Sequence, residues 1–394
     1  MRLQLTDGAR ARARLTCTRT STLASGAVRL WLALALLALP SLAHADGSIA
    51  VRGVYYKERA TRVMQPMLDG VFEAGERGLV TSHFLVDAIT SASASAGAAD
   101  AVAFTENRYE AGIGYTHQLH DLRIGGDAKY STESDYRSLY AGVRGELELA
   151  QKNTVLGLGG GIGYDVISAG SGGGLAQPTI ECTRGQAEQP ECSLTSLSLF
   201  VSATQIVSRN AVVGLSADVA RLDGYQSNPY RSAIAGDELI SERHPTLRNR
   251  QAIAALVRYF VPRTQTALIG SYRYYRDTWE VHGHTPEVRV IQQIGDAGDA
   301  AFRYRYHTQD GSFFFRDRYT DAEGVMGFVS DDVKLSSTST HTIEAKLGML
   351  GSAFELEGKW GNTRFEAMLQ YVVQYNRFGN AIVAHVGLTV PFDY

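Results

Sequence analysis

Charged side chains stand two residues apart in several segments of this 394-residue chain. Arg303, Arg305 and His307, for example, alternate with aromatic residues. Because successive side chains of a β-strand point to opposite faces, this spacing gathers the charges on one face. A charge that faced lipid would cost about 2–4 kcal/mol at the bilayer midplane, so in a membrane strand this face would border a lumen. The lumen-lining candidates are Arg108, Glu110, Arg123, Asp127, Lys129, Arg144, Glu146, Glu148, Arg258, Arg273, Arg303, Arg305, His307, Glu344, Lys346, Arg364 and Glu366.

Metal chemistry has two weaker candidates. His282 and His284 are two residues apart, about 7 Å along a strand, and would need a third ligand from a neighbouring strand. Glu280 and Glu287 are nearby in sequence. The acidic stretch 310–332 lacks the regular Asp spacing of a calcium loop, so we predict an acidic surface loop there. We therefore assign no metal and no cofactor.

Enzyme and nucleotide chemistry find little support. The run Gly157 to Gly163 fails the G-x-G-x-x-G spacing, because Ile162 takes the last position, and its glycines suit a strand in which side chains pack closely. No G-x-S-x-G elbow occurs, and no serine, histidine and acid are spaced as a recognisable triad. We predict that the protein is not an enzyme, with an outer-membrane hydrolase as a lesser alternative.

The segment Ala381 to Tyr394 shows most clearly what positions these charges. Apolar residues from Ile382 to Tyr394 occupy its even positions, while His385, Gly387 and Thr389 fall between them. This alternation predicts a strand with one apolar face, and the same pattern recurs through the chain. Many of the runs are ten to fifteen residues long, which exceeds the five or six typical of a soluble sandwich. They match tilted strands that cross a membrane.

Connections between these runs alternate between short and long. Short ones fall at 120–121, 151–153, 209–210, 262–263 and 296–299, and long ones at about 170–192, 223–246 and 310–336. This alternation matches short periplasmic turns and long extracellular loops. We predict an all-β, antiparallel, up-and-down transmembrane β-barrel of about 16 strands. Their predicted starts are near Ser48, Arg62, Gly78, Thr105, Leu122, Tyr136, Thr154, Ser193, Ala211, Arg248, Thr264, Trp279, Ala300, Thr340, Arg364 and Ala381.

Strand number is an even count in bacterial barrels of this kind, so 14 and 18 strands remain alternatives. We interpret residues 351–362 as a long periplasmic connection, because a further strand there would make the number odd. The last strand should close the barrel against the first, near Ile49 to Tyr56. The sequence does not decide between a monomer and a homo-oligomer.

The N-terminus predicts export. An apolar run from Leu30 to Leu39 follows an arginine-rich stretch and precedes Ala43-His44-Ala45, a small-x-small cleavage site, so residues 1–45 are predicted to be a signal peptide and residues 46–394 the barrel. Residues 1–45 hold six arginines and one aspartate, which leaves 32 basic and 40 acidic residues in the barrel. This acidic balance argues against a nucleic-acid partner.

Two cysteines remain in the exported chain. Cys182 and Cys192 lie in a stretch rich in glycine, proline and glutamine. In an oxidising compartment they are predicted to form a disulfide that closes a loop, with a metal pair as the weaker reading.

A family resemblance joins several of these segments. They are residues 54–59 (VYYKER) with 62–66, the loop 224–230 (GYQSNPY), 271–279 (SYRYYRDTW) with His284-Thr285, 302–309 (FRYRYHTQ) and the C-terminal Val390-Pro391-Phe392. The chain resembles an uncharacterised, domain-of-unknown-function family of Gram-negative outer-membrane β-barrels. The resemblance implies a barrel in the bacterial outer membrane, with no established activity, substrate or site residue.

The last strand also resembles an assembly signal. His385, Gly387, Val390 and Phe392 are similar to the signal by which barrel-assembly machinery recognises its clients, although Asp393 and Tyr394 follow the usual final aromatic residue. The implied partners are this machinery, outer-membrane lipid and lipopolysaccharide.

Two functional readings follow from the charged face. In the first, the protein is a passive pore for small polar or charged solutes. In the second, the charges pair off and close the lumen, and the barrel is a structural or interaction protein whose extracellular loops bind a partner. The excess of arginine over lysine on this face favours well-defined pairing.

Overall fold

The computed structural model describes residues 46–59, 61–92, 103–168, 184–186, 189–228 and 231–392. The predicted signal peptide lies outside these residues and stays a prediction. Sixteen long strands are present, and each begins within four residues of its predicted start. They are β1 (Gly47–Lys57), β2 (Thr61–Ala74), β3 (Gly78–Ala92), β4 (Ala103–Leu119), β5 (Leu122–Thr132), β6 (Tyr136–Leu149), β7 (Thr154–Ser168), β9 (Gln189–Ser208), β10 (Ala211–Gly224), β13 (Leu247–Val261), β14 (Thr266–Asp277), β15 (His282–Ile294), β16 (Gly298–Gln309), β17 (Thr338–Leu350), β18 (Arg364–Gln374) and β19 (Ala381–Phe392).

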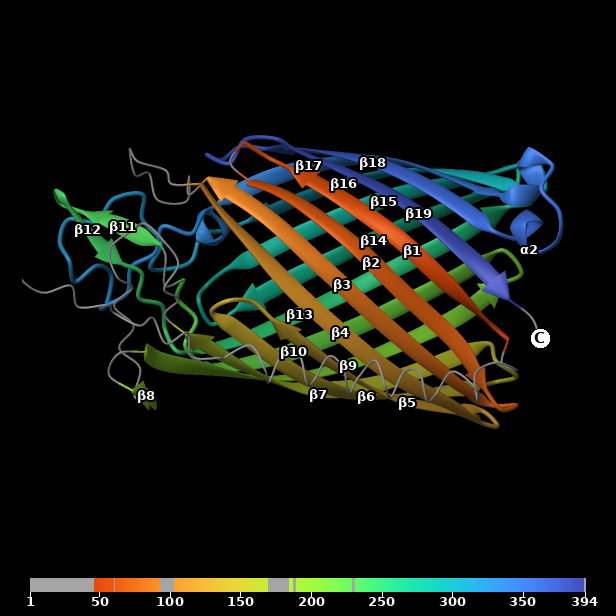
Figure 1. Cartoon of the computed structure of the whole chain (residues 1–394), viewed down its shortest axis with the longest axis horizontal. Coiled ribbons are helices and arrows are strands. Elements are labelled where there is room, and N and C mark those ends of the chain that lie inside the picture. The colour runs from red at the N-terminus through yellow and green to blue at the C-terminus, as the bar shows by residue number, and fades with distance from the viewer. Residues whose placement is uncertain are drawn as a thin grey trace, which may run out of the picture. The chain divides into compact units, whose positions relative to one another are not determined.

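These strands form one closed antiparallel barrel (Figure 1). Each long strand pairs with the next one along the chain. The last strand, β19, pairs with β1 over its whole length, from Gly47 opposite Phe392 to Lys57 opposite Ile382. Closure leaves none of the sixteen strands with an unpaired edge, which is the condition for a sheet to cross lipid. The predicted closed barrel and its seam between the first and last strands are confirmed.

The two faces of the barrel differ in chemistry because apolar and polar residues alternate along each strand. One face carries large apolar side chains that are strongly exposed, such as Val143 at 70% and Val386 at 62%. The other face carries the charged residues. In water so much exposed apolar surface would be unfavourable, at about 25 cal/mol per Å². An exposed apolar face of this extent is what a strand facing lipid requires.

Most of the long connections are at one end of the barrel, whereas the other end has mainly short turns. One end has the start of β1, the end of β19 and short turns such as 120–121, 150–153 and 209–210. The connection 351–363 is at the same end and contains the 3-10 helix η3 (Gly351–Phe354) and the short helix α2 (Gly358–Gly361), so its interpretation as a connection is confirmed. We call this the turn end. The other long connections are at the opposite end, which we call the loop end (Figure 1). No helix among the described residues is long and apolar enough to cross a membrane.

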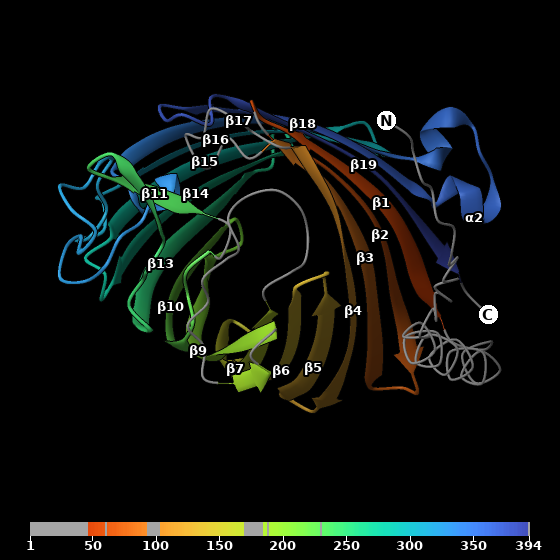
Figure 2. The same cartoon turned by 60° about the vertical axis from the view of Figure 1, so that its left-hand side comes forward.

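Two long connections at the loop end pack into a folded cap, which we define as residues 225–246 and 310–337 without 229–230. The first contains the hairpin β11 (Ser232–Ala235) and β12 (Glu238–Ser241), and the second contains the 3-10 helix η2 (Val333–Leu335). Isolated bridges join Ala235 to Tyr319 and Arg243 to Val329 across the two connections. Figure 2 shows β11 and its neighbours at this end of the barrel.

Three of the four largest fully buried side chains of the described chain are in this cap: Phe314, Val329 and Ser330. Phe314 and Val329 have no exposed surface, and Phe314 makes edge contacts with Trp279 and Phe313. The stretch 310–332 therefore differs from the expected acidic surface loop. Its run of three phenylalanines, 313–315, supplies a small hydrophobic core that holds the acidic residues around it in place.

Candidate functional site

All seventeen lumen-lining candidates lie on the face opposite to the exposed apolar side chains. The strand register shows this directly, because residues opposite each other in neighbouring strands share a face. Arg303 is opposite Glu344, and Arg123 is opposite Glu146. The Nη2 atom of Arg303 also donates to Gln370 Oε1 at 3.4 Å, from β16 across β17 to β18. Contacts that skip a strand need converging side chains, so this is the concave face of the barrel.

Ion pairs cover much of this concave face; some join neighbouring strands, some skip a strand and others lie within one strand or at a turn. Arg364 lies 2.5 Å from Asp299 and 2.9 Å from Glu366, the two distances running from its Nη2 and Nε atoms to the carboxylate oxygens. Glu366 also lies 2.8 Å from Lys346 Nζ. Further pairs are Arg108–Asp87, Lys129–Glu110, Arg123–Glu146, Lys152–Glu148, Arg273–Asp218 and Arg303–Glu344.

Several members of these pairs were missed by the sequence interpretation. They are Arg52, Asp69, His83, Asp87, Asp218, Glu287, Arg289 and Asp299, and all are on the concave face. His83 Nδ1, for instance, lies 2.6 Å from Asp69 Oδ1. The period-two alternation could have predicted them, because each is an even number of residues from the other inward-facing residues of its strand.

Five predicted residues lack an ion-pair partner within 4.0 Å in the part of the chain that the structure describes: Asp127, Arg144, Arg258, Arg305 and His307. Two of these form hydrogen bonds with threonine. Arg144 Nη2 donates to Thr116 Oγ1 at 3.2 Å. His307 Nδ1 lies 2.8 Å from Thr285 Oγ1. That these residues contact a solute in the lumen stays a prediction.

The charges are sorted around the barrel and do not alternate evenly. On the described part of β2 to β6 the concave face carries eight acids and four bases. On β13 to β16 it carries seven arginines and three acids. In the order of strands, these two sectors are separated by β7, β9 and β10 on one side and by β17, β18, β19 and β1 on the other. An acidic wall therefore faces a basic wall.

A nearly uncharged wall of small residues separates them on one side. Gly157, Gly159, Gly161 and Gly163 of β7 share the concave face with serines of β9. A Cβ atom at Gly161 would lie 2.2 Å from the Tyr140 hydroxyl, so the tyrosine ring occupies the space that the missing side chain leaves. The predicted strand with close packing is confirmed.

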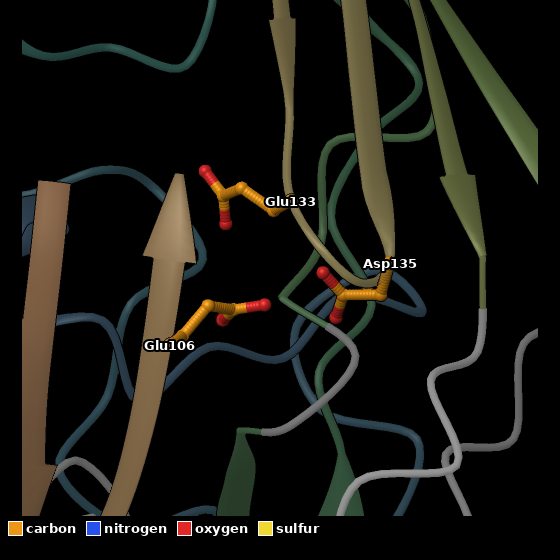
Figure 3. A group of neighbouring side chains, drawn as sticks. All are labelled: Glu106, Glu133 and Asp135. Atoms are coloured by element: carbon orange, nitrogen blue, oxygen red, sulfur yellow. The ribbon is translucent and has the colours of Figure 1, made fainter. Parts of the chain in front are cut away.

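An acidic cluster at the loop end of the acidic wall is a second group that the sequence interpretation missed. Figure 3 shows Glu106 from β4 with Glu133 and Asp135 from the turn between β5 and β6. One carboxylate oxygen of each lies within 4.8 Å of the others. Burial, and then the charge of Glu106, raises the pKa of Glu133 to about 7. One converging oxygen from each carboxylate gives three ligands, fewer than the six to eight oxygens that calcium takes, so the cluster alone does not define a metal site.

The two histidines considered as metal ligands lie on the outer face. His284 Nδ1 is 2.6 Å from the Tyr272 hydroxyl and its ring packs against Tyr274. His282 Nδ1 is 3.7 Å from Asp310 Oδ2. Glu287 is on the concave face, so the register separates it from both histidines. The arrangement resembles the aromatic belts at lipid headgroups more than a metal centre.

The other predicted sites are at the two ends of the barrel. Cys192 is 4% exposed in β9 and packs with Ile167, but Cys182 lies outside the described residues, so the disulfide stays a prediction. In β19, His385 and Gly387 are on the concave face, whereas Val390 and Phe392 are on the outer face. Asp393 and Tyr394 also lie outside the described residues. Recognition of this strand by assembly machinery stays a prediction.

Comparison with known proteins adds a family and a fold. The family described as "Protein of unknown function (DUF3570)" matches residues 101–371. A solved structure described as a bacterial polysaccharide outer membrane secretin matches with a TM-score of 0.50 and 8% identity, over 89% of this chain and 99% of that chain. The Pseudomonas aeruginosa proteins OccK8 (OprE) and OccK3 (OpdO) match with TM-scores of 0.47 and 0.45 and identities of 9% and 10%. These matches cover 89% and 91% of this chain and 99% of each of theirs. No curated protein gives a significant match.

Proposed function

Since the chain belongs to the DUF3570 family, whose function is unknown, we propose its role from the barrel itself: it is a passive pore for small polar or charged solutes in the bacterial outer membrane. The apolar outer face supports the location, because it needs lipid around it. Lipopolysaccharide and barrel-assembly machinery are the partners that such a location implies.

One observation carries the proposal: two of the ion pairs on the concave face remain about half exposed, although others, such as Arg303–Glu344, are largely buried. The side chains of Arg123 and Glu146 are 49% and 44% exposed, and those of Arg273 and Asp218 are 45% and 55% exposed. Ion pairs this accessible contribute only about 0–1 kcal/mol each and do not hold a closed plug together. They are instead the lining expected of a wall that water reaches.

The cap favours a second candidate, a structural or interaction barrel whose extracellular loops bind a partner. Its two connections share a buried core and a buried carboxylate, Glu242, which accepts hydrogen bonds from Ser330 Oγ and the Asp331 amide at 2.8 Å each. A folded surface of this kind suits recognition. In this reading the ion pairs would close the lumen.

Conductance in planar lipid bilayers separates the two candidates. We expect the refolded protein to give steady channels, and a folded but silent barrel would reject the pore. Replacing Arg303 and Arg305 together by glutamate should move the reversal potential toward cation selectivity, because the change lies on the wall. The matched control is Arg263→Glu in the turn between β13 and β14, which should leave the reversal potential nearly unchanged.

A further inference from the structure

Four arginines gather on three adjacent strands of the basic wall. Arg273 is on β14, Arg289 on β15, and Arg303 and Arg305 on β16. We call these four the arginine array. The register sets Arg289 directly opposite Arg303, and like charges in such a position repel each other. An arrangement that is unfavourable for the barrel alone calls for a counter-charge.

The carboxylates nearby are too few to neutralise the array. Glu287 is shared, because its two oxygens lie 3.4 Å from Arg289 and 3.5 Å from Arg303. Arg303 also pairs with Glu344 on β17. Arg273 reaches Asp218 at 3.5 Å, but both side chains of this pair are about half exposed. The array therefore has three paired carboxylates for four arginines, which leaves one positive charge in excess.

Arg305 is the least satisfied member of the array. It is directly opposite Glu287, yet no carboxylate in the described chain lies within 4.0 Å of its guanidinium, and its side chain is exposed on the concave face. The Nε atoms of Arg289 and Arg303 are buried and have no acceptor among the described residues. The array thus offers an accessible guanidinium beside donors that lack partners.

We propose that the arginine array binds an oxyanion of the permeating solute, a small organic anion that carries a carboxylate or a phosphate. The guanidinium fork matches both groups through paired N–H donors, which a lysine ammonium cannot reproduce. This inference rests on the proposed pore and names the class of its solutes. The acidic wall opposite keeps the lumen close to neutral as a whole, so the array acts as a local site.

Direct binding tests the array. The refolded, detergent-solubilised mature protein is titrated calorimetrically with sodium glutarate and, separately, with inorganic phosphate at constant ionic strength. We expect saturable binding of at least one probe, and the tighter of the two identifies the carboxylate or the phosphate class. Arg305→Gln should weaken that binding at least about tenfold. Absence of saturable binding of both probes would overturn the proposal.

The matched control is Arg258→Gln. Arg258 is also an exposed concave-face arginine without an ion pair in the described chain, but it is on β13 and outside the array. It should change binding by less than about twofold. Equal losses in the two variants would show a general field effect and reject a local site.

A second variant, Arg305→Lys, keeps the proposal testable if Arg305→Gln fails to fold. Arg305→Lys keeps the charge and removes the planar fork, so binding should weaken by about threefold or more, and binding as tight as in the unchanged protein would reject the array. Conductance measurements distinguish a failure of the binding site from a failure of the proposed pore. A barrel that binds the probe but stays silent rejects the pore alone, and one that conducts without binding rejects the array alone.

Discussion

Single carboxylates in this protein behave differently according to the charges around them. Glu242 is buried in the cap, and burial alone would raise its pKa, but hydrogen bonding with His244 and the charges of His244 and Arg231 outweigh burial and lower it. Glu133 has the opposite balance, because burial and Glu106 both raise its pKa. The first carboxylate stabilises the cap when it is ionised, whereas the second is costly to ionise.

Glu133 makes the stability of the barrel depend on pH. Its carboxyl has an ordinary pKa of about 4.5 and a folded-state pKa of about 7, so between these values the folded protein holds a proton that the unfolded chain has lost. The free energy of unfolding should therefore fall as pH rises through this window. Glu133→Gln should raise the thermal midpoint at pH 8 and leave it nearly unchanged at pH 4. The thermal midpoint is measured at each pH from the change in gel mobility on heating. Glu323→Gln in the cap is the control.

Among the elements, the cap has hydrophobic clusters of its own. Its core is formed by side chains from both connections and by Trp279 in the turn between β14 and β15, which is 3% exposed. Trp279 also donates from its indole Nε1 to the Leu247 carbonyl at 3.1 Å and lies under the Arg248 guanidinium. The indole therefore links the cap to the rim of the barrel.

Removing the Phe314 side chain should destabilise the cap while the barrel stays folded. Phe314→Ala should destabilise the cap by about 3–5 kcal/mol, because the site is fully buried and leaves a cavity. Trp279 emission should then shift to longer wavelength at lower urea concentration, measured in a Trp360→Phe background. Phe354→Ala, at an exposed position in η3, should leave the transition in place. Simultaneous loss of barrel mobility on gels would contradict an independent cap.

For the molecule as a whole, the alternation of residues was enough to predict the barrel but not its inner arrangement. It placed sixteen strands, the seam between β1 and β19 and the charged face, because the period of two is a local property of the chain. Pairings such as Arg108 with Asp87 depend on register between strands, which local patterns leave open. The cap was missed because its core joins Val329 to Ala233 and Ala235 of the other connection, more than ninety positions away in sequence.

The sorting of charge into two facing walls gives the barrel an electric polarity across its width. A solute with a cationic and an anionic end lowers its energy by turning each end toward the opposite wall, so we expect it to cross broadside. Its length, and not its thickness, would then decide whether it fits. Swelling of proteoliposomes in a series of ω-amino acids should show a sharp decline beyond a certain chain length, while uncharged diols of equal length decline gradually. Identical curves for the two series would mean that the walls do not orient what passes between them.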